Sequence, residues 1–354
     1  MLRRGAGWLS QRPEVPTSVG AVLGHYANTG VFDYASLRLK RRVDETVDRM
    51  LEEAFADVEA AIAEEFGYGQ VSFSYDTKLV MPARLTLGYC YRTLPETDHH
   101  RAEGLTRLAV EALVDGDMRD ALNDGEFEDF EVDFETDRAD RERIGATAQE
   151  VLQARVDAQF ADYPPAVRDA YDWAVDVSER HQAADADFRD LMERARDGAA
   201  DARERIRREY KHAEFEDPPE LFTGSELSLP YLKTQYDRVG VIYDGMIRMY
   251  RSADLPIADA FHRSIVLAIT GAQLWLDDID DYSADMREGQ LTPVTAEYLL
   301  AEDDATAAKT VVEVSDAYLD RAQAEATAAD SALTSIATEY IRLSGTPEVL
   351  PGWD

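Results

Sequence analysis

The sequence contains one cysteine, Cys90, and no apolar run long enough to span a membrane. A single cysteine excludes an internal disulfide framework and a zinc site built from several cysteines. Arg3 and Arg4 near the N-terminus are not followed by a continuous apolar segment, so the pattern indicates no signal peptide. These features predict a cytoplasmic protein with no integral membrane segment.

Lysine is scarce as well, with five among the 37 basic residues, while aspartate and glutamate number 71. The net charge of −34 argues against a general nucleic-acid-binding role, because such proteins need cations to replace the counterions of phosphates. An anionic membrane surface would also repel the chain. Abundant acid and alanine with little lysine resemble halophilic proteins of salt-loving archaea, in which salt screens the repulsion between charges.

Strand patterns are almost missing, and apolar residues recur at the three- and four-residue intervals of helices. We predict an all-α domain of roughly ten or more helices over residues 31–344, between an irregular lead-in at 1–30 and an irregular tail at 345–354. The segment 71–75 alternates briefly without an evident partner strand, and the acidic segment 123–143 indicates a loop or a helix break. The expected helices cover residues 34–66, 77–94, 105–122, 230–250, 256–285, 293–300 and 305–343, with two more within 144–213.

The run from Gln273 to Asp285 places acidic residues on one face of an otherwise apolar helix. Asp277, Asp281 and Asp285 follow at four-residue intervals, Gln273 lies one interval earlier, and Asp278 flanks the row. Stacked carboxylates repel one another and destabilise a helix, which suggests that a cation offsets their charge. Mg²⁺ fits this role, because it prefers oxygen ligands, keeps several waters and bridges to substrate phosphates. The alternative is a solvated acidic face of a halophilic protein.

A second acidic cluster, Asp115, Asp117 and Asp120, ends another apolar helix. Two such helices facing each other across a bundle could hold a metal cluster between them. An acidic helix end without function explains this second segment equally well. The six histidines are isolated or lie in polar segments, so we expect surface or structural roles for them.

Four motifs, in the same chain order, resemble those of class I isoprenoid synthases of the trans-prenyltransferase type. They are similar to an early diphosphate-binding segment, the first aspartate-rich metal motif, a Lys-Thr pair and the second aspartate-rich motif. In this chain they read Lys78-Leu-Val-Met-Pro-Ala-Arg84, Leu113-Val-Asp-Gly-Asp-Met-Arg-Asp120, Lys233-Thr234, and Gln273 with Asp277-Asp278-Ile-Asp-Asp281. Two of the five lysines fall where the family uses lysine, and the resemblance spans roughly residues 70–300.

The resemblance implies one large helical bundle around a central apolar pocket, and a magnesium-dependent enzyme that ionises an allylic prenyl diphosphate. It implies metal binding by Asp117, Asp120, Asp277, Asp278, Asp281 and Asp285, and diphosphate binding by Lys78, Arg84, Lys233, Thr234 and Arg287. Lys233 would place positive charge beside the leaving group, and Gln273 would orient the diphosphate or a metal-bound water. Thr234 also fits an ordinary helix cap. A homodimer is usual in such families.

The chain departs from the family pattern in its first aspartate-rich motif. Gly116 replaces the leading aspartate, and no arginine pair follows the motif. The Lys-Thr pair favours a prenyltransferase. The register of Asp277, Asp281 and Asp285 overlays the metal triad of terpene cyclases and favours a cyclase or a head-to-head condensing enzyme. The departures favour a non-catalytic partner or regulatory member, and a plain acidic scaffold without a site is the remaining alternative.

Overall fold

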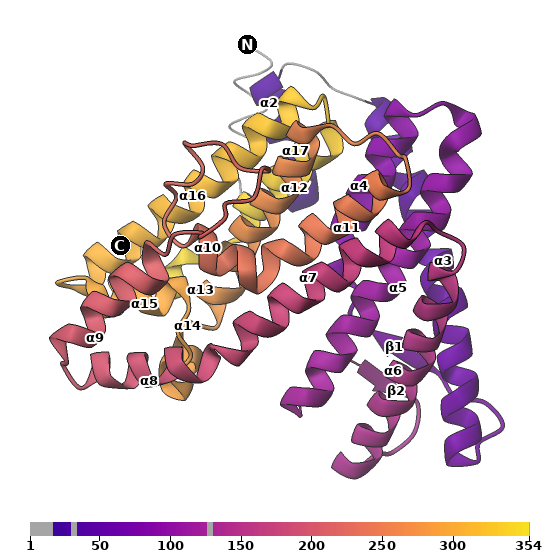
Figure 1. The fold of residues 1–354 in the computed structure, drawn as a ribbon, viewed down its shortest axis with the longest axis horizontal. Helices are drawn as coiled ribbons and strands as arrows, with labels where there is room; N and C mark the ends of the chain where they lie inside the picture. Colours follow the sequence, from indigo (N-terminus) through magenta and orange to yellow (C-terminus); the bar gives the residue numbers. More distant parts are fainter. Residues whose placement is uncertain (1–16, 30–33, 126–129, 354) are drawn as a thin grey trace. The chain divides into compact units, whose positions relative to one another are not determined.

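The computed structural model describes residues 17–29, 34–125 and 130–353 (Figure 1). Within these residues the chain is mostly helical, with one small sheet of two strands. The chain divides into two compact units. Unit 1 comprises Met1–Asp33, Asp172–Gly245 and Ile257–Asp354, and unit 2 comprises Tyr34–Tyr171 and Met246–Pro256. None of the described helices is long and apolar enough to cross a membrane.

Unit 2 is built on four helices that pack on one another: α3 (Tyr34–Phe66), α4 (Met81–Thr93), α5 (His99–Asp124) and α6 (Arg138–Phe160). The predicted helix over 34–66 is confirmed by α3. Pro82 lies in the first turn of α4, where the fixed φ of proline suits a helix start. α5 ends at Gly125, whose φ of 70° lies in the left-handed region that favours glycine. Short 3-10 turns precede α4 and α5, at η1 (Lys78–Val80) and η2 (Glu96–Asp98).

The two strands correct the prediction for unit 2. β1 (Phe73–Tyr75) pairs antiparallel with β2 (Phe130–Val132), so the alternating segment does have a partner, which lies in the segment expected to be a loop. Phe73 and Phe130 are buried, with ring centroids 5.7 Å apart. Cross-strand aromatic packing therefore stabilises a pair too short to show a repeating pattern in the sequence.

Unit 1 centres on α12, which lies against α16; α16 packs in turn on α15 and α17, and α17 packs on α2 (Figure 1). Two further helices, α7 and α11, include residues of both units. The remaining described α-helices are α2 (Thr17–Thr29), α7 (Pro165–Ala183), α8 (Asp185–Arg196), α9 (Ala200–Arg205), α10 (Leu232–Gln235), α11 (Val241–Ser252), α12 (Asp259–Ala272), α13 (Asp278–Asp280), α14 (Tyr282–Glu288), α15 (Pro293–Leu300), α16 (Asp304–Ala328) and α17 (Ala332–Ser344), and the tail contains the 3-10 turn η6 (Pro347–Val349).

Several predicted boundaries in this part of the chain are wrong. The expected irregular lead-in contains α2, because its buried Ala21 and His25 pack on α17, where the Nδ1 atom of His25 lies 3.0 Å from the hydroxyl of Ser335. The expected single helix over 305–343 is interrupted at Asp330, whose φ is 53°. The two helices expected within 144–213 are four, because the chain breaks near Pro165, near residue 184 and at Gly198.

Three segments of unit 1 are π-helical: η3 (Ile206–Lys211), η4 (Tyr236–Gly240) and η5 (Gln273–Asp277). In a π-helix each N–H bonds to the carbonyl five residues earlier, so one residue is inserted relative to the α-helix. Both η4 and η5 pack on α12. Such insertions occur frequently at functional sites, and these segments carry or adjoin the predicted lysine and aspartate motifs.

Candidate functional site

The predicted site residues divide between the two units. Unit 2 holds Lys78, Arg84, Asp117 and Asp120. Unit 1 holds Lys233, Thr234, Gln273, Asp277, Asp278, Asp281, Asp285 and Arg287.

In unit 1, Asp277, Asp281 and Asp285 form a row, which we call the aspartate row. The backbone N–H of Asp281 donates to the carbonyl of Asp277, and that of Asp285 donates to the carbonyl of Asp281, each over 2.9 Å. The three residues therefore occupy successive turns of one face, as predicted, although the segment consists of η5, α13 and α14 rather than one helix. Asp277 and Asp281 are exposed and Asp285 is half-buried.

Gln273 does not continue the aspartate row. The N–H of Asp278 bonds to the carbonyl of Gln273, five residues earlier, because η5 is a π-helix. This insertion aligns Gln273 with Asp278 rather than with Asp277, which corrects the prediction from four-residue spacing. The side chain of Gln273 accordingly acts on Asp278 and stabilises its charged form.

Asp278 points into unit 1 and pairs with an arginine that no motif had indicated. Its side chain is 2% exposed, and Nη1 of Arg238 donates to its Oδ1 over 2.9 Å. The second oxygen, Oδ2, has no hydrogen-bond partner among the described residues. Burial raises the pKa of Asp278, and Arg238 counteracts that shift. A buried carboxylate oxygen without a donor is energetically costly, so it marks a place where a cation would be stabilising.

The charges of this segment act on one another as a group. Burial and the charge of Asp278 raise the pKa of Asp285 to about 7. Burial, Asp278 and Asp281 raise the pKa of Asp277 to about 6. Arg238 lowers both of these pKa values and that of Asp278, so this one guanidinium is a counter-ion to three carboxylates.

The other predicted residues of unit 1 have partners of their own. Nζ of Lys233 lies 2.7 Å from Oδ2 of Asp237, and the Lys233 side chain is one-third exposed. Thr234 is buried within α10, and its hydroxyl donates to the carbonyls of Tyr210 and Tyr231 over 3.2 Å, so it links α10 to η3 rather than capping a helix. Arg287 is exposed and pairs with its neighbour Glu288.

The structure adds residues that the sequence did not indicate. Besides Arg238, these are Asp237, which pairs with Lys233, and His181. Burial lowers the pKa of His181, and the charges of Asp237, Arg238 and Lys233 also act on this histidine. Arg238 follows Lys233 by five residues, an interval that does not repeat on an α-helical face. No motif in the sequence therefore indicated Arg238, which lies on the π-helical segment η4.

In unit 2, the aspartates of the first motif differ in their surroundings. Asp115 is buried and accepts a hydrogen bond from Gln149 over 3.1 Å, while Asp117 accepts one from the hydroxyl of Tyr75. Asp120 is exposed. Asp115 is therefore the least accessible carboxylate of the motif, and Asp117 and Asp120 are the more accessible ones.

The two predicted diphosphate-binding cations of unit 2 are both ion-paired. Arg84 is largely buried and donates to Asp48 over 2.7 Å and to Asp44 over 3.5 Å, both on α3. Lys78 is exposed and lies 2.9 Å from Asp76. Arg84 therefore has a structural partner, and binding to an anion would have to compete with it.

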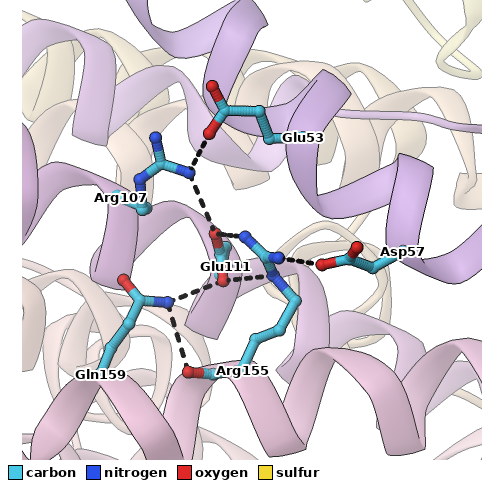
Figure 2. Close-up of polar contacts among 6 residues, drawn as sticks. All are labelled: Glu53, Asp57, Arg107, Glu111, Arg155 and Gln159. Atoms are coloured by element: carbon cyan, nitrogen blue, oxygen red, sulfur yellow. Dashed lines mark hydrogen bonds and ion pairs between the residues drawn. The ribbon is translucent and has the colours of Figure 1, made fainter.

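Glu111, six residues before Asp117 on the same helix, belongs to a buried ion-pair network (Figure 2). It is fully buried, and Arg155 donates to its two oxygens over 2.7 and 3.0 Å. Gln159 donates a third hydrogen bond over 2.7 Å. The same arginine also reaches Asp57, so the network joins α5 to α6 and α3.

The donor set of unit 1 is compatible with magnesium, although no three acidic or histidine side chains of the described residues converge on one point. Mg²⁺ rarely needs such a cage, because it usually binds through one or two carboxylates, several waters and substrate phosphates. The aspartate row and Oδ2 of Asp278 supply oxygen donors only, which suits this hard cation.

Comparison with protein-family models, with curated proteins and with solved structures finds no match. The resemblance to isoprenoid synthases therefore remains a prediction from the motifs, and the function is inferred from the geometry and charge described above.

Proposed function

We propose that the chain is a magnesium-dependent enzyme of the isoprenoid synthase type that ionises an allylic prenyl diphosphate, most simply as a prenyltransferase. The observation that carries the proposal is the group of four carboxylates in unit 1, in which the charges of Asp278 and Asp281 help to raise the pKa values of Asp277 and Asp285 beside Arg238. Divalent cations relieve such repulsion and in turn bind diphosphate.

In the proposed reaction the allylic carbon–oxygen bond breaks, and its electron pair leaves with the diphosphate. Bound Mg²⁺ would supply charge neutralisation on the leaving group. The aspartate row and Asp278 would hold the metal, while Lys233 and Arg238 would place fixed positive charge where negative charge develops. Gln273, aligned with Asp278, would orient that carboxylate. The motif resemblance adds Asp117 and Asp120 as further ligands, Lys78 and Arg84 as further cations, and an apolar pocket for the hydrocarbon.

A terpene cyclase or head-to-head condensing enzyme is the second candidate, and one observation favours it. The aspartate row presents three carboxylates at four-residue intervals on one face, while Asp278 turns inward to Arg238. That arrangement fits the three-residue metal triad of terpene cyclases, which consists of Asp277, Asp281 and Asp285 in this chain. It fits less well the prenyltransferase motif, in which Asp278 would itself bind the metal. The third candidate is a non-catalytic member of the fold, because Gly116 replaces the leading aspartate of the first metal motif.

The test is release of inorganic diphosphate from prenyl diphosphates of several lengths, measured with Mg²⁺ in high salt. We expect turnover by the native chain and its loss in the double variant D277N/D281N. Asp280→Asn is the matched control, because Asp280 is an exposed neighbour with the same charge outside the row. Elongated product supports the prenyltransferase, and cyclic or fused hydrocarbon supports the second candidate. No release by a folded native chain would contradict both enzymatic proposals.

A further inference from the structure

Tyr231 has a backbone conformation that its side chain does not favour. The non-glycine residues with positive φ in the described part of the chain are Tyr231, Asp254 and Asp330. Aspartate tolerates the left-handed region, because its short polar side chain can bond locally, whereas a bulky aromatic residue there is strained. The φ of Tyr231 is 64°, and the residue directly precedes α10, so contacts elsewhere in unit 1 must hold this turn.

Two residues distant in the sequence hold the turn at Tyr231. The N–H of Tyr231 donates to the carbonyl of Lys211 over 2.6 Å, and its hydroxyl donates to Oε1 of Glu297 over 2.7 Å. Nζ of Lys211 lies 2.7 Å and 2.9 Å from the two oxygens of Glu297, so the three residues form a closed network. Burial and the charge of Glu297 raise the pKa of Tyr231, so the hydroxyl keeps the proton that it donates. The network thereby fixes η3, the start of α10 and α15 to one another.

This turn determines where α10 begins and therefore where Lys233 lies. The carbonyl of Tyr231 accepts the N–H of Gln235 over 2.9 Å and the hydroxyl of Thr234 over 3.2 Å. Lys233 is the second residue of α10, and its side chain, one-third exposed, lies beside Asp237. Because Lys233 follows Tyr231 by two residues, a change of φ at Tyr231 reorients the backbone that carries the ammonium group.

We propose that Tyr231, Glu297 and Lys211 are positioning residues that keep the ammonium group of Lys233 where it binds the diphosphate of the substrate. None of the three needs to contact the ligand, because each acts through the left-handed turn. A flexible lysine side chain that must be ordered on binding loses affinity, so a preorganised ammonium group binds an anion more tightly. The inference rests on the proposed function and deepens it by naming the network that places one of its cations.

A double-mutant cycle on the full chain in high salt tests this role. Isothermal titration calorimetry measures the binding of inorganic diphosphate, in saturating Mg²⁺, to the native chain, Tyr231→Phe, Lys233→Gln and the double variant. For Y231F we expect about fivefold weaker binding, equivalent to about 1 kcal/mol, and for K233Q about tenfold weaker binding from the loss of one charge. Because Tyr231 acts through Lys233, the double variant should bind no more weakly than K233Q alone.

Tyr210→Phe is the matched control for the loss of a buried hydroxyl. The hydroxyl of Tyr210 donates to the carbonyl of Leu291 over 2.8 Å, and its ring lies 5.8 Å from that of Tyr231. The variant therefore removes the same group from the same aromatic cluster without releasing the turn, and the affinity for diphosphate should stay at the native value.

The outcomes separate this inference from the proposed function. A native chain that binds diphosphate, with the same affinity in Y231F or in K233Q, would overturn the positioning role and leave the site intact. Additive losses in the double variant, or an equal loss in Y210F, would show a general effect of packing and also overturn it. A native chain that does not bind diphosphate overturns the proposed function and the inference with it. Should Y231F fail to fold, K211M/E297Q leaves no unpaired buried charge, and its cycle with K233Q must show the same lack of additivity.

Discussion

The guanidinium of Arg238 and the buried carboxylate of Asp278 lie 2.9 Å apart and join η4 to the residue that follows η5. Both residues lie at π-helical segments, since η4 carries the arginine and η5 aligns Gln273 with the aspartate. The pair turns Asp278 inward and leaves Asp277, Asp281 and Asp285 on the outer face. A buried ion pair thus lies directly beside an open row of carboxylates.

Removing one charge from the aspartate row should stabilise the fold while impairing ligand binding. For Asp281→Asn we expect the free energy of unfolding without ligands to rise by about 0.2–0.5 kcal/mol, because two like-charged four-residue neighbours lose their repulsion. The same variant should lose stabilisation by magnesium-diphosphate. Chemical denaturation measures the first effect and calorimetric titration the second, with D280N as the control. A variant that is less stable and binds normally would contradict the role of the row.

The raised pKa values predict how stability depends on pH. Asp277 titrates near 6 and Asp285 near 7 in the folded protein, well above the ordinary aspartate pKa. Between about pH 4 and pH 7 the folded chain therefore binds more protons than the unfolded chain, so these groups lower stability as the pH rises through that window. We expect Asp285→Asn to be more stable than the native chain at pH 8, with the difference vanishing near pH 4. Melting temperatures measured across this range check the sign, and a difference that grows on acidification would contradict it.

Glu111 should be essential for stability rather than for chemistry. Glu111→Ala leaves Arg155 and Gln159 without their buried acceptor, so we expect a loss of about 3 kcal/mol in the free energy of unfolding. Glu53→Gln affects an exposed partner of Arg107 in the same network and should change stability by less than about 1 kcal/mol. Urea denaturation of both variants measures the contrast. Equal losses of unfolding free energy in the two variants would show that the burial of Glu111 does not determine its contribution to stability.

The net charge of −34 predicts a strong dependence of stability on salt. Raising the ionic strength from about 0.1 M to 1 M shortens the screening length from about 10 Å to about 3 Å, which removes most repulsion between surface carboxylates. We expect the melting temperature to rise steadily with potassium chloride over this range. Calorimetric scans at constant pH measure it, and a flat or falling curve would argue against a halophilic surface.

The long, strongly periodic helices could be predicted from the sequence. The bounds of α3 and α15 match because apolar residues recur regularly and Thr292 and Pro293 mark a helix start. The pairing of β1 with β2 could not be predicted, since three-residue strands depend on tertiary contacts of Phe73 and Phe130. The helix α2 was missed for the same reason, because its contacts lie on α17, far along the chain.

The candidate site could be predicted where the backbone keeps α-helical spacing, and it could not be predicted where the backbone is π-helical. The aspartate row keeps its four-residue intervals, so its common face followed from the sequence. The π-helical insertion in η5 moved Gln273 by one position, and no residue pattern signals such an insertion. Arg238 lies on η4, outside every motif. The buried orientation of Asp278 likewise depends on an arginine 40 residues earlier in the chain.

The most direct test of the central claim is a thermal scan with Mg²⁺ and inorganic diphosphate, separately and together, in high salt. A ligand pair present at a hundred times its dissociation constant stabilises the folded state by about 2.7 kcal/mol. We predict that the two ligands together raise the melting temperature of the native chain by several degrees more than the sum of their separate effects, and that D277N/D281N shows no such rise while D280N retains it. A native chain whose melting temperature responds to the pair no more than to the added salt, or a D277N/D281N variant that responds as the native chain does, would contradict a metal-diphosphate site on the aspartate row.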